Sequence, residues 1–523
     1  MGPPFILKVY GPPGTGKTSY LLSRVQEALN SGQFQPEDIA FVAFTKAAAN
    51  EAIARSRLIA DAEFPWFRTI HSACFRLLGL HKGQVMDGKD WRAFGAQGGY
   101  DFSDEHHFIE ELEIRESMLK TLGDSLRHFD QWRRNRMLGV DQGYKCFPRP
   151  RSVPWDLSLC RLFRSRLADY KAATSKVDFT DMIEMVLREE LSPAPRMLVV
   201  DEGQDLSKLM WLVIDLWMQR TERVIYAGDE DQCLYQWLSA EPKVFLDRPC
   251  DEELVLGQSY RVPRAVHAFS QALIQRNKVR HPKIYRPTSD PGYLLRGCEL
   301  TDLPIQEMAE VGTVFMLARN IRFLDSYTEV LKRLAIPYEN LRGPSPFKGR
   351  AAKAYWVAHR LSKGHDVSIA ELNEMIHIVS SKPWLHWGYK TELAGLAASS
   401  PGAKITLSMI SGFTPATVDL FRHGRFEEAL QLPKETVAYL SNVIKKWGPE
   451  TLLKKPKTLV GSVHSVKGAE ADNVILSPDM ARASFRELLT DPEGERRVFY
   501  VGATRARRGL WLLNPSQPEH YTW

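Results

Sequence analysis

The stretch FILKVYGPPGTGKT, residues 5–18, decides the fold of this chain. Its apolar run over residues 5–10 predicts a buried strand, and a helical pattern begins at Ser19. Between the two, Gly11 to Thr18 fits the pattern G-x-x-x-x-G-K-[ST]. In this strand–loop–helix context the pattern predicts a phosphate-binding loop, because backbone amides and the start of a helix present positive dipoles to an anion.

Each part of this loop has an expected role toward a nucleoside triphosphate. Lys17 is expected to reach the β- and γ-phosphates, and Thr18 to hold Mg²⁺. The predicted nucleotide-binding residues of the loop are Gly11, Gly14, Thr15, Gly16, Lys17 and Thr18. A glycine-rich turn that arose by chance is the alternative, but it does not explain a strand and a helix at the required positions.

A second apolar run, RMLVV at residues 196–200, ends in two acids, Asp201 and Glu202. We expect Asp201 to anchor the Mg²⁺ and Glu202 to polarise the attacking water. Taken alone, such a pair is as readily explained as an acidic strand end that faces solvent. Beside a phosphate-binding loop, it predicts hydrolysis of the nucleotide.

Size and composition limit the class of protein. A chain of 523 residues suits two to four domains, and 44% hydrophobic with 25% charged residues is typical of a globular protein. The net charge of +6 permits nucleic-acid binding without requiring it. The six cysteines form no Cys-x-x-Cys pair, and no signal peptide or long apolar run is present. We therefore expect a cytoplasmic protein without a zinc ribbon or a disulfide framework.

Short apolar runs alternate with helical patterns along most of the chain, which is typical of a parallel sheet in an α/β fold. The runs form two groups, so two α/β cores are expected. Two charged, helical stretches interrupt them. The expected division is a first core of residues 1–76 and 178–258 with a helical insertion of 77–177, and a second core of 259–346 and 456–523 with a helical insertion of 347–455.

Several further segments, taken in order along the chain, resemble the motifs of superfamily 1 helicases of the UvrD/Rep type. They are AFTKAAANEA (43–52), TIHSACFRLL (69–78), DFTDMI (178–183), VVDEGQD (199–205), AGDEDQCLYQW (227–237), QSYR (258–261), LARN (317–320), SVHSVKGAEADNVIL (462–476) and RRVFYVGATRA (496–506). Each is a weak signal alone, but their common order is specific. The resemblance implies two tandem RecA-like cores, each with a mainly helical insertion, in a compact form of the family.

The resemblance also implies roles at the nucleotide. Gln232 would sense the γ-phosphate, Tyr260 would stack on adenine, and Glu470 would contact the nucleotide. Arg261 and Arg505 would act as arginine fingers, which contribute about 10³- to 10⁵-fold in rate. If the fingers come from the second core, hydrolysis requires the two cores to close. Closure would then move the DNA-binding residues of one core relative to those of the other.

Contacts with DNA are implied in the same way. Tyr235 and Trp237 match aromatics that stack on the bases of a single strand, although Trp237 could instead be an ordinary core aromatic. The other matched positions are Phe44, Thr45, Thr69, His71 and His464. For the small polar residues among them, turn or cap hydrogen bonds are the alternative. Asp178 and Asp181 are interpreted as structural.

Two basic clusters are either solvated charged surfaces or a track for DNA phosphates. The first comprises Arg133, Arg134 and Arg136, and the second Lys445, Lys446, Lys454, Lys455 and Lys457. Relatives usually carry a glutamine upstream of the loop that reads adenine, and none of the ten residues before Gly11 is a glutamine. Strict preference for ATP is therefore not predicted.

The first hypothesis for the function is an ATP- and Mg²⁺-dependent translocase and DNA helicase of 3′ to 5′ polarity, for replication or repair. Its partners would be single-stranded DNA and junctions between single and double strands. The alternative is a regulatory ATPase that binds DNA or a partner protein without processive unwinding. A small-molecule kinase with this loop would not explain the two insertions and the paired arginines.

Overall fold

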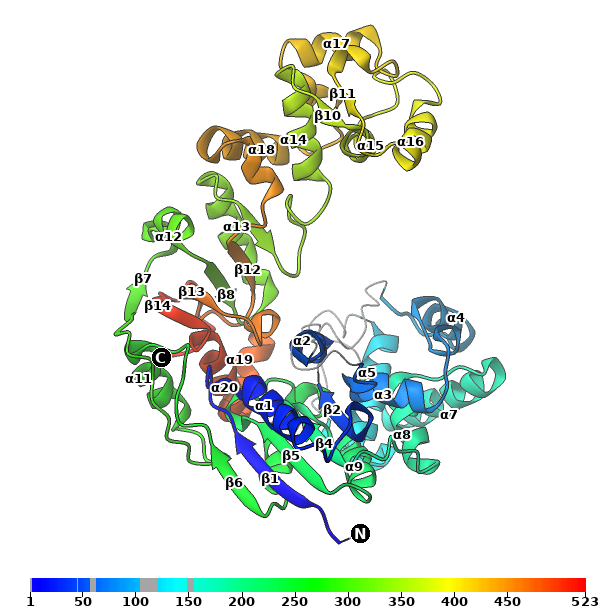
Figure 1. Ribbon diagram of the computed structural model, residues 1–523, viewed down its shortest axis with the longest axis vertical. Helices are drawn as coiled ribbons and strands as arrows, with labels where there is room; N and C mark the ends of the chain where they lie inside the picture. Colours follow the sequence, from blue (N-terminus) through cyan, green and yellow to red (C-terminus); the bar gives the residue numbers. More distant parts are fainter. Residues whose placement is uncertain (1, 45, 57–62, 104–120, 148–154) are drawn as a thin grey trace. The chain divides into compact units, whose positions relative to one another are not determined.

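The computed structural model describes residues 2–44, 46–56, 63–103, 121–147 and 155–523 (Figure 1). By its packing, the chain divides into two compact units. The first comprises Met1–Tyr293, Lys467–Ala469 and Arg486–Arg508, and the second comprises Leu294–Val466, Glu470–Phe485 and Gly509–Trp523. The structure contains two six-stranded sheets, as the two groups of apolar runs predicted.

The sheet of the first unit has the strand order β3–β2–β4–β5–β1–β6, and all neighbouring strands run parallel. Its strands are β1 (Phe5–Tyr10), β2 (Ile39–Ala43), β3 (Trp66–Thr69), β4 (Met197–Val200), β5 (Arg223–Gly228) and β6 (Glu252–Val255). The predicted phosphate loop follows β1 and the predicted acids follow β4. Both therefore lie at the carboxyl edge of the sheet, where ligands bind in open α/β folds.

Helices cover both faces of this sheet, because alternate residues of a strand point to opposite sides. Val42 and Val200 pack with α3 (Ile70–Leu77), α8 (Phe179–Arg188) and α9 (Lys208–Met218). On the other face, Phe41 and Val199 pack with α1 (Lys17–Asn30) and α2 (Lys46–Ser56). Burial on both faces explains the nearly continuous apolar sequence of these strands.

The first insertion is helical in its described part, between α3 and α8. It contains α4 (Gly88–Gly98), α5 (Leu122–Asn135), α6 (Val140–Cys146) and α7 (Leu157–Thr174). These helices share an aromatic-rich core of their own, which includes Trp91, Phe94, Phe129, Trp132 and Phe163. A further short helix, α10 (Pro242–Leu246), precedes β6.

The second sheet has the strand order β7–β14–β13–β8–β12–β9. Its strands are β7 (Tyr293–Cys298), β8 (Val314–Ala318), β9 (Tyr338–Asn340), β12 (Thr458–Ser462), β13 (Ala471–Leu476) and β14 (Ala506–Leu513). The central strand β8 is parallel to both of its neighbours, β12 and β13. The helices α12 (Ile305–Val311), α13 (Leu324–Arg333) and α19 (Arg482–Thr490) connect these strands.

The second insertion, which lies between β9 and β12, is also mainly helical. Its helices are α14 (Ala351–Ser362), α15 (Ile369–Ile376), α16 (Tyr389–Ser399), α17 (Pro415–Arg422) and α18 (Lys434–Trp447), with a two-stranded ribbon of β10 (Val367–Ser368) and β11 (Lys404–Ile405). Its apolar residues continue the core of the second sheet. Over the described ranges, no helix is both long and apolar enough to span a membrane.

Part of the predicted second core packs with the first unit. Residues 259–293 and 486–508 belong to that unit, where α11 (Arg264–Ile274) packs against α20 (Pro492–Ala503). Both predicted arginine fingers, Arg261 and Arg505, therefore share a compact unit with Lys17. The family resemblance had placed both on the second core, and β14, which follows Arg505 directly, is a strand of the second sheet.

Candidate active site

The loop between β1 and α1 has the backbone geometry that its glycines predict. Gly14 and Gly16 both have φ near +73°, a conformation that residues with a Cβ seldom adopt. A Cβ on Gly11 would lie 2.8 Å from the Cβ of Lys17, so this position also needs glycine. Gly16 precedes the first residue of α1, and the free amides of that helix start are suited to phosphate oxygens.

Lys17 lies between the two predicted acids. Its ammonium is 2.8 Å from Glu202 Oε1 and 3.4 Å from Asp201 Oδ1. Burial disfavours the charged ammonium, but Glu202 and Asp201 more than offset this and raise the pKa of Lys17. The same contact lowers the pKa of Glu202 to about 2 against its burial, with help from Lys467. Glu202 is therefore ionised near neutral pH, as a group that polarises water must be.

Thr18 and Asp201 offer oxygen ligands at one point. The Thr18 hydroxyl donates to Asp201 Oδ2 at 3.0 Å, which brings the two predicted Mg²⁺ ligands together. Hydroxyl and carboxylate oxygens are ligands that Mg²⁺ prefers, and it fills its other positions with phosphate oxygens and water. These residues thus fit the expected ion.

Glu202 is held in an unusual backbone conformation. Its φ of 55° and ψ of 38° are left-handed, and non-glycine residues with such geometry are enriched at functional sites. The buried Gln204 holds the carboxylates on either side of it: its Nε2 donates to Glu202 and, at 3.0 Å, to Asp205 Oδ2. No role was predicted for Gln204 from the sequence, although it lies in the segment VVDEGQD.

The segment QSYR packs directly on the phosphate loop. Ser259 Oγ donates to Pro13 O at 2.8 Å, and the backbone amide of Tyr260 donates to Gly14 O at 2.8 Å. A Cβ on Gly14 would lie 2.4 Å from the Cβ of Arg261, so glycine is required on steric grounds as well. The ring of Tyr260 is 77% exposed beside Gly16, open to a base on one face. Ser259 was not predicted as a site residue.

Two other predicted residues of the nucleotide site contact each other. Arg505 Nη2 donates to Gln232 Oε1 at 3.0 Å and to Thr504 Oγ1 at 3.3 Å, while its Nε donates to Val501 O and its Nη1 to Ala469 O. Arg505 is only 1% exposed, so its position is set by packing rather than by solvent. The predicted contact of Glu470 with the nucleotide stays a prediction, since Glu470 is an exposed residue of the second unit.

Lys467 had no predicted role, but it contacts both the residues of this site and the ring of Tyr235. Its ammonium contacts Asp205, donates to Gln232 O at 2.9 Å and lies 4.0 Å from Glu202 Oε2. The same ammonium lies 4.8 Å from the centre of the Tyr235 ring, a cation–π contact. Its place within the segment SVHSVKGAE was the only signal in the sequence.

The predicted DNA-stacking residues lie in the first unit with little exposed surface. Tyr235 is 2% exposed and stacks on Phe44 with ring centres 5.3 Å apart. Trp237 is 9% exposed, and its ring lies 5.9 Å from that of His128. This burial is what the core-aromatic alternative expects for Trp237, so its base-stacking role stays a prediction.

The remaining predicted DNA contacts are dispersed. Thr69 Oγ1 accepts from the Ser72 amide at 3.2 Å and caps α3, as the alternative for small polar residues proposed. His71 lies edge-on to Phe179, and its burial lowers its pKa to about 4. His464 is buried in the second unit, and Thr45 lies outside the described residues.

The first basic cluster is used for internal ion pairs. Arg134 Nη1 donates to Asp178, Nη2 to Asp181 and both Nη2 and Nε to Glu184, at 2.5–3.3 Å. Arg133 pairs with Asp130 and Arg136 with Glu241. This arrangement favours the structural alternative over a phosphate track for these three arginines, and it supports the structural interpretation of Asp178 and Asp181.

Arg134→Ala is expected to lower the free energy of unfolding by about 3–5 kcal/mol, because it leaves the buried Asp178 and its neighbour Asp181 with Lys171 as their one remaining paired cation among the described residues. Urea or thermal unfolding of the full chain measures this effect. The control is Arg161→Ala, which removes a solvent-exposed pair with Asp141 and should cost at most about 1 kcal/mol. A variant with unchanged stability but weaker DNA binding would restore the phosphate-track interpretation.

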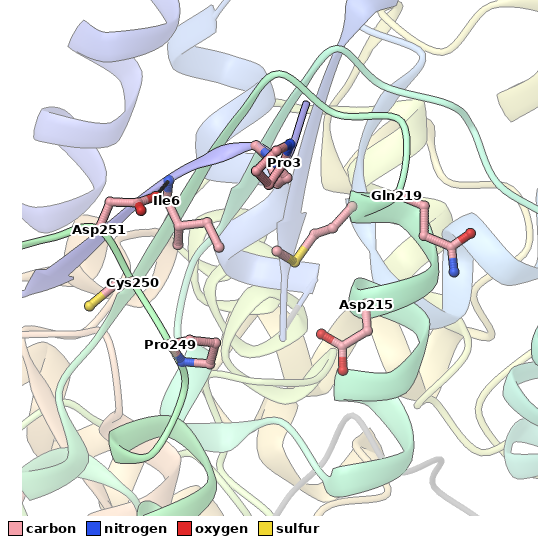
Figure 2. Close-up of a pocket in the computed structure, with 9 residues that line it drawn as sticks. Pro3, Ile6, Asp215, Gln219, Pro249, Cys250 and Asp251 are labelled. Carbon is pink, nitrogen blue, oxygen red and sulfur yellow. Dashed lines mark hydrogen bonds between the residues drawn. The ribbon is translucent and has the colours of Figure 1, made fainter. Parts of the chain in front are cut away.

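A pocket of about 320 Å³ lies away from this site, at the amino end of β1 (Figure 2). In Figure 2, Asp215 and Gln219 come from the carboxyl end of α9, while Pro249, Cys250 and Asp251 come from the segment before β6. Because the phosphate loop leaves the opposite end of β1, the pocket has no part in nucleotide binding.

The site combines a phosphate-binding loop at the end of a parallel strand with a lysine, two acids and the predicted Mg²⁺ ligands. This combination defines the class of P-loop nucleotide hydrolases. Comparison with known proteins identifies the family within that class. The UvrD/REP helicase N-terminal domain matches residues 5–251, and the UvrD-like helicase C-terminal domain matches residues 458–513. Together these segments span more than half of the chain, which therefore belongs to the UvrD/Rep helicases of superfamily 1.

The sequence identity with individual members of the family is low. The chain is similar to the ATP-dependent DNA helicase UvrD2 of Mycobacterium tuberculosis, with 24% identity over 96% of this chain and 76% of that protein. It is also similar to the ATP-dependent DNA helicase PcrA of Staphylococcus aureus, with 24% identity over 52% of this chain and 38% of that protein. The family resemblance inferred from the ordered segments is thus confirmed.

Proposed function

We propose that this protein is an ATP-dependent translocase on single-stranded DNA and a DNA helicase of 3′ to 5′ polarity. The observation that carries the proposal is the arrangement of Asp201 and Glu202 around Lys17 and Thr18, the first two residues of α1. Family membership supports DNA as the track, since the UvrD2 and PcrA relatives are named ATP-dependent DNA helicases.

Hydrolysis follows from the positions of the side chains. Mg²⁺, when bound, would neutralise charge on the β- and γ-phosphates, and Thr18 and Asp201 would hold it. The Lys17 ammonium would move from the acids onto the phosphates, because the triphosphate offers it a stronger negative partner. Glu202 would then be released to accept a proton from the attacking water. Arg505 and Arg261 would stabilise the charge that develops on the γ-phosphoryl group.

Lys467 supports coupling of hydrolysis to DNA. It contacts the ring of Tyr235, which is predicted to face the strand, and also Asp205 and Glu202 beside the predicted water. Tyr235 is 2% exposed, so a base would stack on it only after its ring becomes accessible, and this movement would change the contact of the Lys467 ammonium with Glu202. We therefore expect single-stranded DNA to accelerate hydrolysis.

The test is ATP hydrolysis by the full chain with and without single-stranded DNA, followed by strand displacement on duplexes with a 3′ or a 5′ tail. Stimulation by DNA and displacement from the 3′-tailed duplex are the expected results. Hydrolysis that is indifferent to DNA would contradict the motor function. Displacement from 5′ tails alone would contradict the polarity.

Trp237→Ala is expected to weaken strand displacement far more than basal hydrolysis, because stacking contributes about 1–3 kcal/mol per base. Strand displacement and DNA-free hydrolysis are measured on the same preparation. Trp211→Phe provides the comparison, since Trp211 is 2% exposed and should affect both activities together through the core. An equal loss of both activities in Trp237→Ala would assign this residue to the core.

A further inference from the structure

Three successive acids, Asp229, Glu230 and Asp231, follow β5 and are completely buried. The Lys283 ammonium lies among them, 2.8 Å from Asp229 Oδ1, 2.9 Å from Asp231 Oδ2 and in contact with Glu230 Oε1. Arg280 adds a second cation, 2.8 Å from Asp231. Buried charges persist only when they are paired, so the position of these carboxylates depends on Lys283.

The cluster is built around this lysine rather than around a metal ion. The three carboxylates lie close enough together to share an ion. However, the ammonium of Lys283 already contacts all three of them, with its side chain only 1% exposed. Burial lowers the pKa of Lys283, but the three carboxylates raise it by more, so the group stays charged.

Asp229 connects the cluster to the nucleotide site through hydrogen bonds. Its Oδ2 accepts a hydrogen bond from Gln232 Nε2 at 2.7 Å, and Gln232 Oε1 accepts from Arg505 Nη2 at 3.0 Å. A carboxylate can only accept and a guanidinium can only donate. The two neighbours therefore permit one orientation of the Gln232 amide, with its oxygen toward Arg505.

The backbone of Asp229 is held separately. Its amide donates to Gln204 Oε1 at 2.9 Å, and Gln204 also contacts Glu202 and Asp205. Loss of Lys283 would thus leave the chain path of residue 229 supported. The side-chain carboxylate would keep its hydrogen bonds from the Asp231 amide at 3.2 Å and from Gln232, but without its nearest cation its position would be held less firmly.

We propose that Lys283 is a positioning residue of the nucleotide site, which holds Asp229 so that the Gln232 amide presents its oxygen to Arg505. This role rests on the proposed function, because Gln232 and Arg505 act there on the γ-phosphate. It makes Lys283, which follows α11 in the chain, a residue that acts on the nucleotide site through Asp229 and Gln232.

The test uses the full chain with Lys283→Met and measures kcat and KM for ATP with saturating single-stranded DNA, and binding of a fluorescent ATP analogue. The expected result is a fall in kcat of about 10- to 100-fold, the scale of effect when a catalytic group is misplaced. Nucleotide affinity should change much less, because Lys17 and the loop are untouched. Lys278→Met is the matched control, an exposed lysine of the same segment.

Two further variants keep the test decisive if Lys283→Met does not fold. Lys283→Met with Glu230→Gln and Asp231→Asn reduces the excess negative charge while Asp229 is retained. Asp229→Asn leaves Lys283 in place but replaces the acceptor-only partner of Gln232 Nε2 with an amide that can also donate, so that Arg505 alone selects the orientation of the Gln232 amide. Each should lower kcat, whereas a purely structural lysine would shift the unfolding midpoint and leave kcat per folded molecule unchanged, which would overturn the proposal.

A double-mutant cycle identifies the route. If Lys283 acts through Gln232, then Lys283→Met should add little further loss to Gln232→Ala. Full additivity of the two losses would refute this route while wild-type hydrolysis still supported the proposed function. Absence of hydrolysis in the wild type would instead refute the proposed function, and the role of Lys283 with it.

Discussion

Lys17→Ala is expected to reduce ATP hydrolysis by about 10²- to 10³-fold or more, the scale of loss when a preorganised charge on the transition state is removed. In the structure its ammonium is the only one that contacts both Asp201 and Glu202 among the described residues. Without it, Asp201 and Glu202 face the triphosphate with less positive charge beside them, since Lys467 lies 4.0 Å from Glu202, so nucleotide affinity should fall as well. Steady-state hydrolysis and binding of a fluorescent ATP analogue measure the two effects.

Lys208→Ala is the control for this variant. Lys208 is an exposed lysine at the start of α9, 3.7 Å from Glu241, and its loss should leave hydrolysis close to wild type. Both variants should retain the wild-type unfolding midpoint within a few degrees. Hydrolysis by a folded Lys17→Ala at more than about a tenth of the wild-type rate would remove the phosphate loop from the mechanism.

Arg505→Ala is expected to lower kcat by about 10³-fold or more, as for the loss of an arginine finger. Because Arg505 donates to Gln232, the predicted γ-phosphate sensor, its loss should affect the chemical step, and binding of the ATP analogue should change little. A large loss in kcat with nearly constant affinity identifies an interaction made in the transition state. The burial of Arg505 requires that unfolding be measured on the same protein.

Arg508→Ala is the matched control, since Arg508 is an exposed arginine at the start of β14. Arg505→Lys separates charge from geometry: it keeps the cation but cannot hold Gln232, Val501 and Thr504 together, so most of the loss should remain. An Arg505→Ala protein that is folded and hydrolyses ATP normally would assign this residue to packing alone.

The parts predicted from the sequence are those in which local chemistry decides the structure. The strand before Gly11, the left-handed turns at Gly14 and Gly16, and the acids after β4 all depend on a few neighbouring residues.

The parts that were missed depend on partners far apart in the chain. Lys283 and Asp229 are 54 positions apart, and neither lies in a pattern that names the other. Lys467 reaches Asp205 from 262 positions away. The cluster Arg133, Arg134 and Arg136 seemed basic in sequence because the acids that neutralise Arg134 lie on a different helix, α8. Periodicity and composition do not indicate which distant residues pair.

The ion pairs of Arg134 have a consequence for how this fold can be rearranged. Arg134 lies on α5 of the first insertion, yet its partners Asp178, Asp181 and Glu184 begin and line α8, which covers the sheet. The insertion is therefore not an exchangeable cassette. A chimera that grafts another relative's insertion between α3 and α8 would have to import that relative's α8 as well, so the natural unit of exchange extends past residue 184.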